Sequence, residues 1–181
     1  MICGIDEVGR GCIFGPVLSA AVIFKGNPNF LNELDDSKKL TKAKREYLSS
    51  LILENSYYAF AEVSNETIDK INIHHASLLA MQIAYEKLDI NCDLVLVDGK
   101  FIPKIKAKKI QAIIKGDSII NEIKAASIIA KVQRDKLMDE YNKTYPLYAL
   151  NKNKGYPTKE HKEAIKKHGI SNLHRRSFKF I

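Results

Sequence analysis

The chain has 181 residues, of which 45% are hydrophobic and 28% are charged, a composition typical of soluble globular proteins and unlike that of disordered or fibrous ones. At this length we expect a single domain that buries roughly 70% of the surface of its unfolded chain. The longest apolar stretch, residues 17–24, is far shorter than the ~20 residues that span a bilayer. The acidic start of the chain is unlike a targeting segment, so we expect a cytoplasmic protein.

Charge is divided unevenly along the chain. Residues 1–99 carry 9 Lys and Arg against 14 Asp and Glu, a net charge of −5, whereas residues 100–181 carry 20 against 7, a net charge of +13. Clustered Lys and Arg gain affinity for phosphates by releasing counterions. The asymmetry therefore favours a nucleic acid partner over the alternative, a solvated surface that only aids solubility.

Hydrophobic periodicity predicts an alternation of strands and helices. We expect strands at 3–6, 17–24, 57–63, 94–97 and 111–114, and helices at 41–54, 73–88, 119–141 and 158–169, with an irregular stretch around 150–157. The last two strands are continuous apolar runs, which are typical of strands buried on both faces. Strands followed by alternating strands and helices predict an α/β fold, with one mixed sheet covered by helices.

Four carboxylates follow three of these strands. Asp6 and Glu7 close the first strand, Asp98 follows the strand at 94–97, and Asp117 follows the strand at 111–114. Sites in open α/β sheets form outside the carboxyl ends of strands. One such acid is more often a turn residue, but four of them in a chain with a basic half indicate a site for Mg²⁺ or Mn²⁺. Two such ions suit phosphodiester hydrolysis without a protein nucleophile.

A glycine-rich loop follows the first strand. Gly9, Arg10 and Gly11 resemble part of a dinucleotide-binding motif, but Pro16 and a β-type run follow where that motif requires a helix. We expect instead a loop whose glycines let a ligand approach the backbone closely and whose arginine meets a phosphate. The alternative is a tight turn between two strands.

Two basic segments could contact a nucleic acid backbone. Ser37, Lys38 and Lys39 precede a predicted helix, where they could hold a phosphate or form a solvated lysine pair. Residues 152–179 contain nine Lys and Arg with interleaved aromatic side chains, a pattern that suits nucleic acid binding. Within this second segment we expect Arg175 and Arg176 to contact phosphates.

The remaining polar groups are expected to be structural. Cys3, Cys12 and Cys92 show no C-x-x-C spacing, and we expect buried thiols rather than a disulfide or zinc site. The five histidines have no metal-binding spacing, and we expect most of them at the surface. Lys131 and Asp135 are spaced for an ordinary ion pair along a helix.

Eight motifs in chain order closely resemble those of bacterial ribonuclease HII. They are GIDEVGRG at 4–11, DSKKL at 36–40, INIHHASLLAM at 71–81, VDGK at 97–100, KGD at 115–117, AASIIAKVQRD at 125–135, GYPTKEH at 155–161 and HRRSF at 174–178. The resemblance implies a ribonuclease H-like mixed sheet flanked by helices, with a helical C-terminal part. We expect one domain, residues 1–181, with its core at about 1–145 and a basic substrate-binding part at about 146–181.

The resemblance also implies an activity. Members of the family are metal-dependent endoribonucleases that cleave the RNA strand of RNA/DNA hybrids and nick DNA on the 5′ side of embedded ribonucleotides, leaving 3′-OH and 5′-phosphate ends. These reactions serve ribonucleotide excision repair and RNA primer removal. Asp6, Glu7, Asp98 and Asp117 match the catalytic acids, which would bind two Mg²⁺ or Mn²⁺ ions during catalysis. We expect a monomer.

Substrate recognition is implied by two of the motifs. The loop of Gly9, Arg10 and Gly11 matches the segment that senses the ribose 2′-OH, and Tyr156 matches a residue that stacks on the neighbouring deoxyribose. Cys12 departs from the family, which usually has proline there, and this could loosen the loop. The chain also lacks the short extension that many members carry after the position of Phe178. The related HIII type has an extra N-terminal domain, for which we expect no room before a motif that begins at residue 4.

Two other functions compete with this interpretation. A non-catalytic, basic RNA-binding α/β protein would explain the charge but not four acids at strand ends. A phosphatase acting on small phosphate esters would explain the acids but not the basic C-terminal segment.

Overall fold

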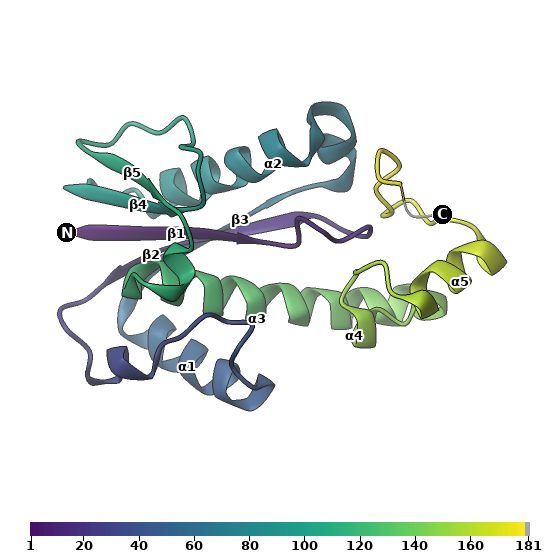
Figure 1. The fold of residues 1–181 in the computed structure, drawn as a ribbon, viewed down its shortest axis with the longest axis horizontal. Helices are drawn as coiled ribbons and strands as arrows, with labels where there is room; N and C mark the ends of the chain where they lie inside the picture. Colours follow the sequence, from purple (N-terminus) through teal and green to yellow (C-terminus); the bar gives the residue numbers. More distant parts are fainter. Residues whose placement is uncertain (180–181) are drawn as a thin grey trace.

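The structure of the protein is a computed structural model, in which residues 1–179 are described. Its five strands form one mixed sheet in the order β3-β2-β1-β4-β5 (Figure 1). The strands are β1 (Ile2–Val8), β2 (Val17–Phe24), β3 (Ser56–Val63), β4 (Leu94–Asp98) and β5 (Ile110–Ile113). β1 pairs with β2 antiparallel and with β4 parallel, β2 pairs with β3 antiparallel, and β4 pairs with β5 parallel. The predicted mixed sheet is confirmed.

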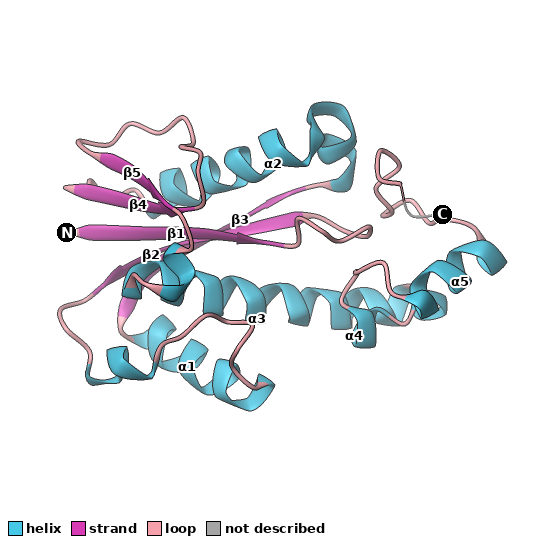
Figure 2. Cartoon of the chain, viewed as in Figure 1, coloured by secondary structure: helices cyan, strands magenta, loops and turns pink. Residues whose placement is uncertain are grey.

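Helices cover both faces of this sheet (Figure 2). α2 (Asn65–Leu88) lies on one face, and α1 (Lys42–Glu54) and α3 (Asn121–Thr144) lie on the other. The short helices α4 (Leu150–Asn153) and α5 (Lys159–His168) lie beyond the sheet, beside the C-terminal end of α3. Single turns of 3-10 helix occur at η1 (Asn29–Glu33), η2 (Gly116–Ser118) and η3 (Pro146–Tyr148). Within residues 1–179 no helix has the length and apolar character that crossing a membrane requires.

The central strand β1 is buried between the two helical layers. Its side chains alternate, so that Cys3 and Ile5 join the apolar cluster beneath α2. Gly4 faces α3 at such close range that a Cβ would lie 2.1 Å from the backbone carbon of Glu122. The absence of a side chain at this position therefore sets how closely α3 can pack against the strand that carries two of the acids.

Several predicted boundaries were wrong. α2 begins at Asn65, eight residues before the predicted start. Ser64 caps this additional N-terminal segment, which joins the rest of the helix across a kink at Asn72 (φ 64°). β5 is not buried on both faces, since it is the edge strand and packs only partly. The stretch at 150–157, predicted to be irregular, contains the short helix α4.

We predicted most of the five histidines at the surface, but two of them are fully buried. His161 and His174 lie 3.2 Å apart between their Nε2 atoms, and both pack against the ring of Phe14. This cluster joins α5 and the C-terminal segment to the loop between β1 and β2. Cys3, Cys12 and Cys92 are buried free thiols, as predicted.

We predict that acid weakens the fold through this histidine pair. Burial lowers the pKa of His161, and burial together with the charge of His161 lowers the pKa of His174 to about 4. Unfolded His174 takes up a proton below about pH 6.5 and the folded side chain does not, so the free energy of unfolding should fall by on the order of 3 kcal/mol between about pH 6.5 and about pH 4. Urea unfolding across this range measures the loss.

Two variants test whether His174 causes this pH dependence of the free energy of unfolding. His174→Gln should be less stable at pH 7 but should lose less stability on acidification. His168→Ala, which changes an exposed histidine of the same segment, should retain the pH dependence of the unchanged protein. A His174→Gln variant with an unaltered pH dependence would contradict the assignment.

Candidate active site

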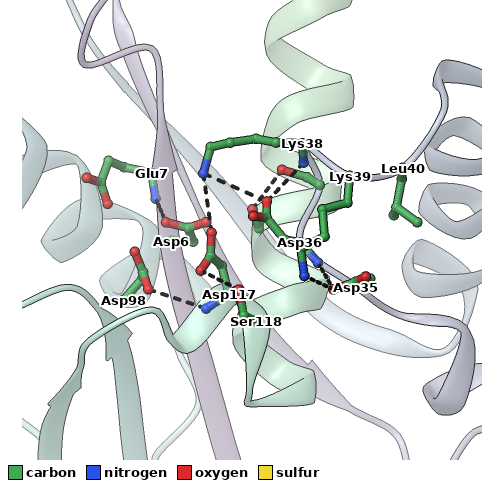
Figure 3. A network of polar contacts seen from close by, with 12 residues as sticks. Asp6, Glu7, Asp35, Asp36, Lys38, Lys39, Leu40, Asp98, Asp117 and Ser118 are labelled. Atoms are coloured by element: carbon green, nitrogen blue, oxygen red, sulfur yellow. Dashed lines mark hydrogen bonds and ion pairs between the residues drawn. The ribbon is translucent and has the colours of Figure 1, made fainter.

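Parallel pairing brings the four predicted acids to one edge of the sheet. Asp6 and Glu7 lie near the end of β1, Asp98 is the last residue of β4, and Asp117 lies in η2, just after β5. Because β1, β4 and β5 run parallel, their carboxyl ends meet at the same edge. All four acids line one open pocket of about 420 Å³. Figure 3 shows Asp6, Asp98 and Asp117 side by side, with Glu7 to one side of them.

Backbone contacts hold the carboxylates in this arrangement. The backbone N–H of Glu7 donates to Asp6 Oδ1 at 2.7 Å, and the backbone N–H of Asp117 donates to Asp98 Oδ1 at 3.3 Å. A 3-10 turn makes the second bond possible, because Lys115, in the left-handed region (φ 57°), turns the chain back toward β4. The site thus depends on a backbone conformation that the strand pattern alone does not reveal.

The electrostatics of the pocket favour a cation. Burial raises the pKa of Asp6 well above its usual range, and the charges of Glu7 and Asp98 raise it further. Burial also raises the pKa of Glu7, against the opposing effect of Arg10, and burial followed by the charge of Asp117 raises the pKa of Asp98. Carboxylates that are desolvated and close together destabilise one another's charged forms, so positive charge in the pocket would stabilise the site.

The contacts of individual carboxylate oxygens are consistent with a need for positive charge in the pocket. Glu7 Oε1 accepts a hydrogen bond from Arg10 Nη1 at 3.1 Å, whereas Glu7 Oε2 is buried and has no hydrogen-bond partner among residues 1–179. Lys38 Nζ lies 3.3 Å from Asp117 and 3.8 Å from Asp36 (Figure 3). Across residues 1–179 no three acidic, histidine or cysteine side chains form a ready-made ligand cluster. The acids line the walls of the pocket, and the lysine supplies positive charge among them.

The glycine loop forms a further part of the same pocket. Gly9 has a positive φ of 90°, and a Cβ there would lie 2.4 Å from Arg134 Nε, so packing alone requires glycine. A Cβ on Gly11 would meet only Tyr156, at 3.7 Å. Gly9, Arg10, Gly11 and Tyr156 all line the pocket. The structure therefore brings together the acids, the loop and the tyrosine predicted from separate motifs.

Cys12 closes the loop in place of proline. Its backbone N–H donates to the carbonyl of Gly9 at 3.3 Å, a bond that proline could not make. Its thiol, which is buried, donates to the carbonyl of Lys154 at 3.5 Å and so connects the loop to the segment before Tyr156. These contacts tie the loop internally and to the C-terminal part of the chain.

Two buried arginines hold this loop, a role that we predicted for neither of them from the sequence. Arg134 donates to the carbonyls of Phe14 and Pro16. Arg175 donates to the carbonyls of Gly15 and Pro16, and its Nη1 donates to the carbonyl of Arg10 at 3.1 Å. The expectation that Arg175 contacts phosphates was wrong, because its side chain is fully buried beneath the loop. The signals for Arg134 in the sequence were its place in the long, mostly interior helix and in the motif at 125–135.

Other predicted binding residues lie in different surroundings. Ser37 lines the pocket, but its hydroxyl is buried 3.0 Å from the hydroxyl of Ser127. Lys39 pairs with Asp35 at 3.2 Å and does not line the pocket. Arg176 is exposed in the C-terminal segment and does not line the pocket.

One predicted structural pair is confirmed. Lys131 Nζ and Asp135 Oδ1 are 2.7 Å apart along α3, as the spacing indicates. Lys131 also lines the pocket, so this ion pair lies at its border.

Comparison with known proteins agrees with these observations. Residues 3–181 match the family described as Ribonuclease HII. The chain is 99% identical over all 181 residues to a ribonuclease HII of Borrelia hermsii, with 100% of both chains covered.

Solved structures share the fold. The crystal structure of the ribonuclease H2 from Pyrococcus horikoshii is similar, with a TM-score of 0.82 and 27% identity over 99% of this chain and 94% of that chain. Bst-RNase HIII, in a structure in complex with Mn²⁺, has a TM-score of 0.81 at 19% identity over 98% of this chain and 66% of its own, and this likeness supports the fold alone. The predicted ribonuclease H-like fold is confirmed, the enzyme is a ribonuclease H, and the chain belongs to the ribonuclease HII family.

Proposed function

We propose that this ribonuclease H is a metal-dependent endoribonuclease that cleaves the RNA strand of RNA/DNA hybrids and nicks DNA 5′ of embedded ribonucleotides, leaving 3′-OH and 5′-phosphate ends. We further propose that it acts as a cytoplasmic monomer in ribonucleotide excision repair and RNA primer removal. One observation carries the cleavage proposal: four carboxylates from three parallel strands share a pocket with a glycine loop and an exposed tyrosine.

Asp6, Glu7, Asp98 and Asp117 are the residues that would hold Mg²⁺ or Mn²⁺, with two ions during catalysis. The support is the oxygen-only donor set, the unpartnered buried Oε2 of Glu7 and the raised pKa values of the acids. When bound, such ions lower the pKa of water and stabilise charge on the leaving oxygen. Within the chain, Lys38 balances the charge of Asp117.

The glycine loop of residues 9–11 recognises the ribose of the substrate. Backbone groups of residues 9–11 can approach a sugar closely, and the open space beside Gly11 leaves room for a 2′-OH. Arg10 is half exposed beside Glu7 and can meet a phosphate there. Arg134 and Arg175 do not touch substrate in this proposal; they position the loop from beneath.

Tyr156 and the C-terminal part have separate tasks. Tyr156 is 39% exposed at the pocket, so its ring is free to stack on the deoxyribose 3′ of the ribonucleotide. The lysines of α5 and Arg176 are exposed and would contact phosphates together with Lys38. We also propose a single domain, with a core at about 1–145 and a basic binding part at about 146–181. Residues 180 and 181 of the binding part lie outside the described residues.

The decisive test uses duplex DNA with one ribonucleotide. The unchanged protein should nick this duplex on the 5′ side of the ribonucleotide when Mg²⁺ or Mn²⁺ is added. Asp98→Asn should cut at least about 100-fold more slowly, because removing one carboxylate weakens the hold on the ions by several kcal/mol. Binding without cleavage by the unchanged protein would instead favour a non-catalytic RNA-binding function.

Thermal unfolding gives a readout that is independent of activity. Without metal, Asp98→Asn should unfold at a higher temperature than the unchanged protein, because it relieves carboxylate repulsion. Added Mn²⁺ should raise the unfolding temperature of the unchanged protein more than that of the variant. Asp89→Asn, at an exposed helix end, is the matched control and should respond to Mn²⁺ like the unchanged protein.

Tyr156→Ala should separate two substrates. A single embedded ribonucleotide always presents a deoxyribose to the tyrosine, whereas a continuous hybrid presents a ribose at most positions. We therefore expect a loss of about 10-fold or more in kcat/KM on the single-ribonucleotide duplex, from a stacking contribution of about 1–3 kcal/mol, and a smaller loss on the hybrid. Equal losses on the two substrates would leave Tyr156 as a packing residue.

Salt should reveal how many phosphates the basic surface contacts. The logarithm of the binding constant should fall against the logarithm of salt concentration with a slope of roughly −0.9 per neutralised phosphate. Arg176→Ala should reduce the slope by about 1. Lys25→Ala, which removes a lysine stacked on Tyr57 at the far end of β2, should leave the slope unchanged, and an overall slope near zero would refute the binding surface.

A further inference from the structure

A turn at residues 175–178 carries Arg175, whose guanidinium bonds to the loop between β1 and β2. The backbone N–H of Phe178 donates to the carbonyl of Arg175 at 3.1 Å and closes the turn. The ring of Phe178 also packs against the guanidinium, with 5.2 Å between Cζ of Arg175 and the ring centroid. The position of this turn therefore decides which carbonyls the guanidinium can reach.

One carboxylate on α2 holds the two central residues of this turn. The backbone N–H of Arg176 donates to Asp69 Oδ2 at 3.0 Å, and the backbone N–H and the hydroxyl of Ser177 donate to Asp69 Oδ1 at 2.9 and 2.6 Å. Asp69 lies in the part of α2 before the kink at Asn72, beside the C-terminal segment (Figure 1). Three donors from the C-terminal segment thus converge on a single side chain more than a hundred residues away along the chain.

These three bonds suit the charged form of Asp69. Partial burial acts to raise the pKa of Asp69, but the hydrogen bonds from Ser177 and Arg176 outweigh this effect and lower the pKa below its usual value. The carboxylate offers acceptors on both of its oxygens, whereas an amide would offer an acceptor on only one. An aspartate can therefore hold both central residues of the turn, and an asparagine cannot.

Asp69 also acts on the charge of Arg175. Burial lowers the pKa of Arg175, and repulsion from Arg134 adds to this effect, whereas the charge of Asp69 acts in the opposite direction. The groups to which the guanidinium of Arg175 donates are uncharged carbonyls of the loop. Asp69 therefore holds the turn in place and favours the charged form of the arginine within it.

From Arg175 the contacts continue into the glycine loop. Nη1 of Arg175 donates to the carbonyl of Arg10 at 3.1 Å, and its backbone N–H donates to the carbonyl of Ile13 at 2.9 Å. Arg10 lies between Gly9 and Gly11, and all three residues line the pocket. Hydrogen bonds of this kind need donor–acceptor distances of about 2.7–3.2 Å, so a displaced turn would release the backbone of the loop.

We propose that Asp69 is a positioning residue for recognition of the ribose: it holds the turn of residues 175–178 so that Arg175 fixes the backbone of the loop at residues 9–11. Asp69 touches no substrate and acts only through Arg175. This inference rests on the proposed function, in which the loop recognises the 2′-OH.

Hydrogen–deuterium exchange tests the link from Asp69 to the loop without any substrate. Asp69→Asn should speed amide exchange in peptides covering residues 10–16 by about 3- to 10-fold, as for the loss of about one hydrogen bond, and should leave exchange in β3 unchanged. In this segment the hydrogen-bonded backbone N–H groups are those of Cys12, Ile13 and Gly15. Faster exchange confined to residues 172–178, or spread over the whole chain, would overturn the proposal.

Two further variants complete the exchange experiment. Ser177→Ala removes only the hydroxyl donor to Asp69, so it should speed exchange in the same peptides by a smaller factor, and it replaces Asp69→Asn if that variant does not fold. Glu66→Gln neutralises an exposed acid one turn earlier on α2 and is the matched control. It should leave exchange in the loop unchanged, and an effect equal to that of Asp69→Asn would contradict a specific role for Asp69.

Binding in EDTA, where no cleavage occurs, measures recognition of the ribose. The Kd for an all-DNA duplex is divided by the Kd for the same duplex with one ribonucleotide, so that general effects on phosphate binding cancel. Asp69→Asn should reduce this ratio by about 3- to 10-fold, and Glu66→Gln should not change it. An unchanged ratio in Asp69→Asn, despite faster exchange in the loop, would refute the role in recognition.

The two readouts separate this proposal from the proposed function. If the unchanged protein failed to nick the single-ribonucleotide duplex with metal added, the proposed function would fail, and the exchange rates would still show whether Asp69 holds the loop. Normal nicking by the unchanged protein, together with unaltered loop exchange in Asp69→Asn, would reject the positioning role and leave the nuclease assignment intact.

Discussion

Two buried guanidinium groups hold together the parts of the chain that form the pocket. Arg134 on α3 and Arg175 in the C-terminal segment both donate to carbonyls of the loop between β1 and β2. Moving each charge out of water costs several kcal/mol. Burial lowers the pKa of Arg175 to about 9, and repulsion from Arg134 contributes to the shift. Carbonyl oxygens oriented toward them offset this cost, so the loop conformation and the arginine positions require each other.

This interdependence explains why the loop contains glycine at a fixed position. Gly9 packs directly on the side chain of Arg134, whereas Gly11 faces the open pocket and Tyr156. The first glycine serves packing, and the second leaves space in the pocket. Because Arg175 also bonds to the carbonyl of Arg10, the C-terminal segment reaches the centre of the loop without entering the pocket itself.

The buried arginines have partners that stabilise their charge, whereas the acids destabilise one another's charged forms. Asp6, Glu7 and Asp98 are brought together by strand pairing although burial and proximity raise their pKa values. A rigid central sheet can maintain such a cluster, since its backbone hydrogen bonds and apolar core stabilise the fold independently of the pocket. The destabilising part of the structure is therefore also the part suited to bind cations.

The sequence by itself determined the sheet-and-helix alternation, the four acids at strand ends and the family, because apolar periodicity and short motifs are local properties. It could not place β5 at the edge, extend α2 back to Asn65 or bury His174 and Arg175, since these features depend on which segments meet in space. Composition alone predicts that every charge of the basic C-terminal segment lies at the surface. Only the tertiary structure decided which of these charges are exposed and which support the loop, because burial is set by packing partners that lie more than a hundred residues away along the chain.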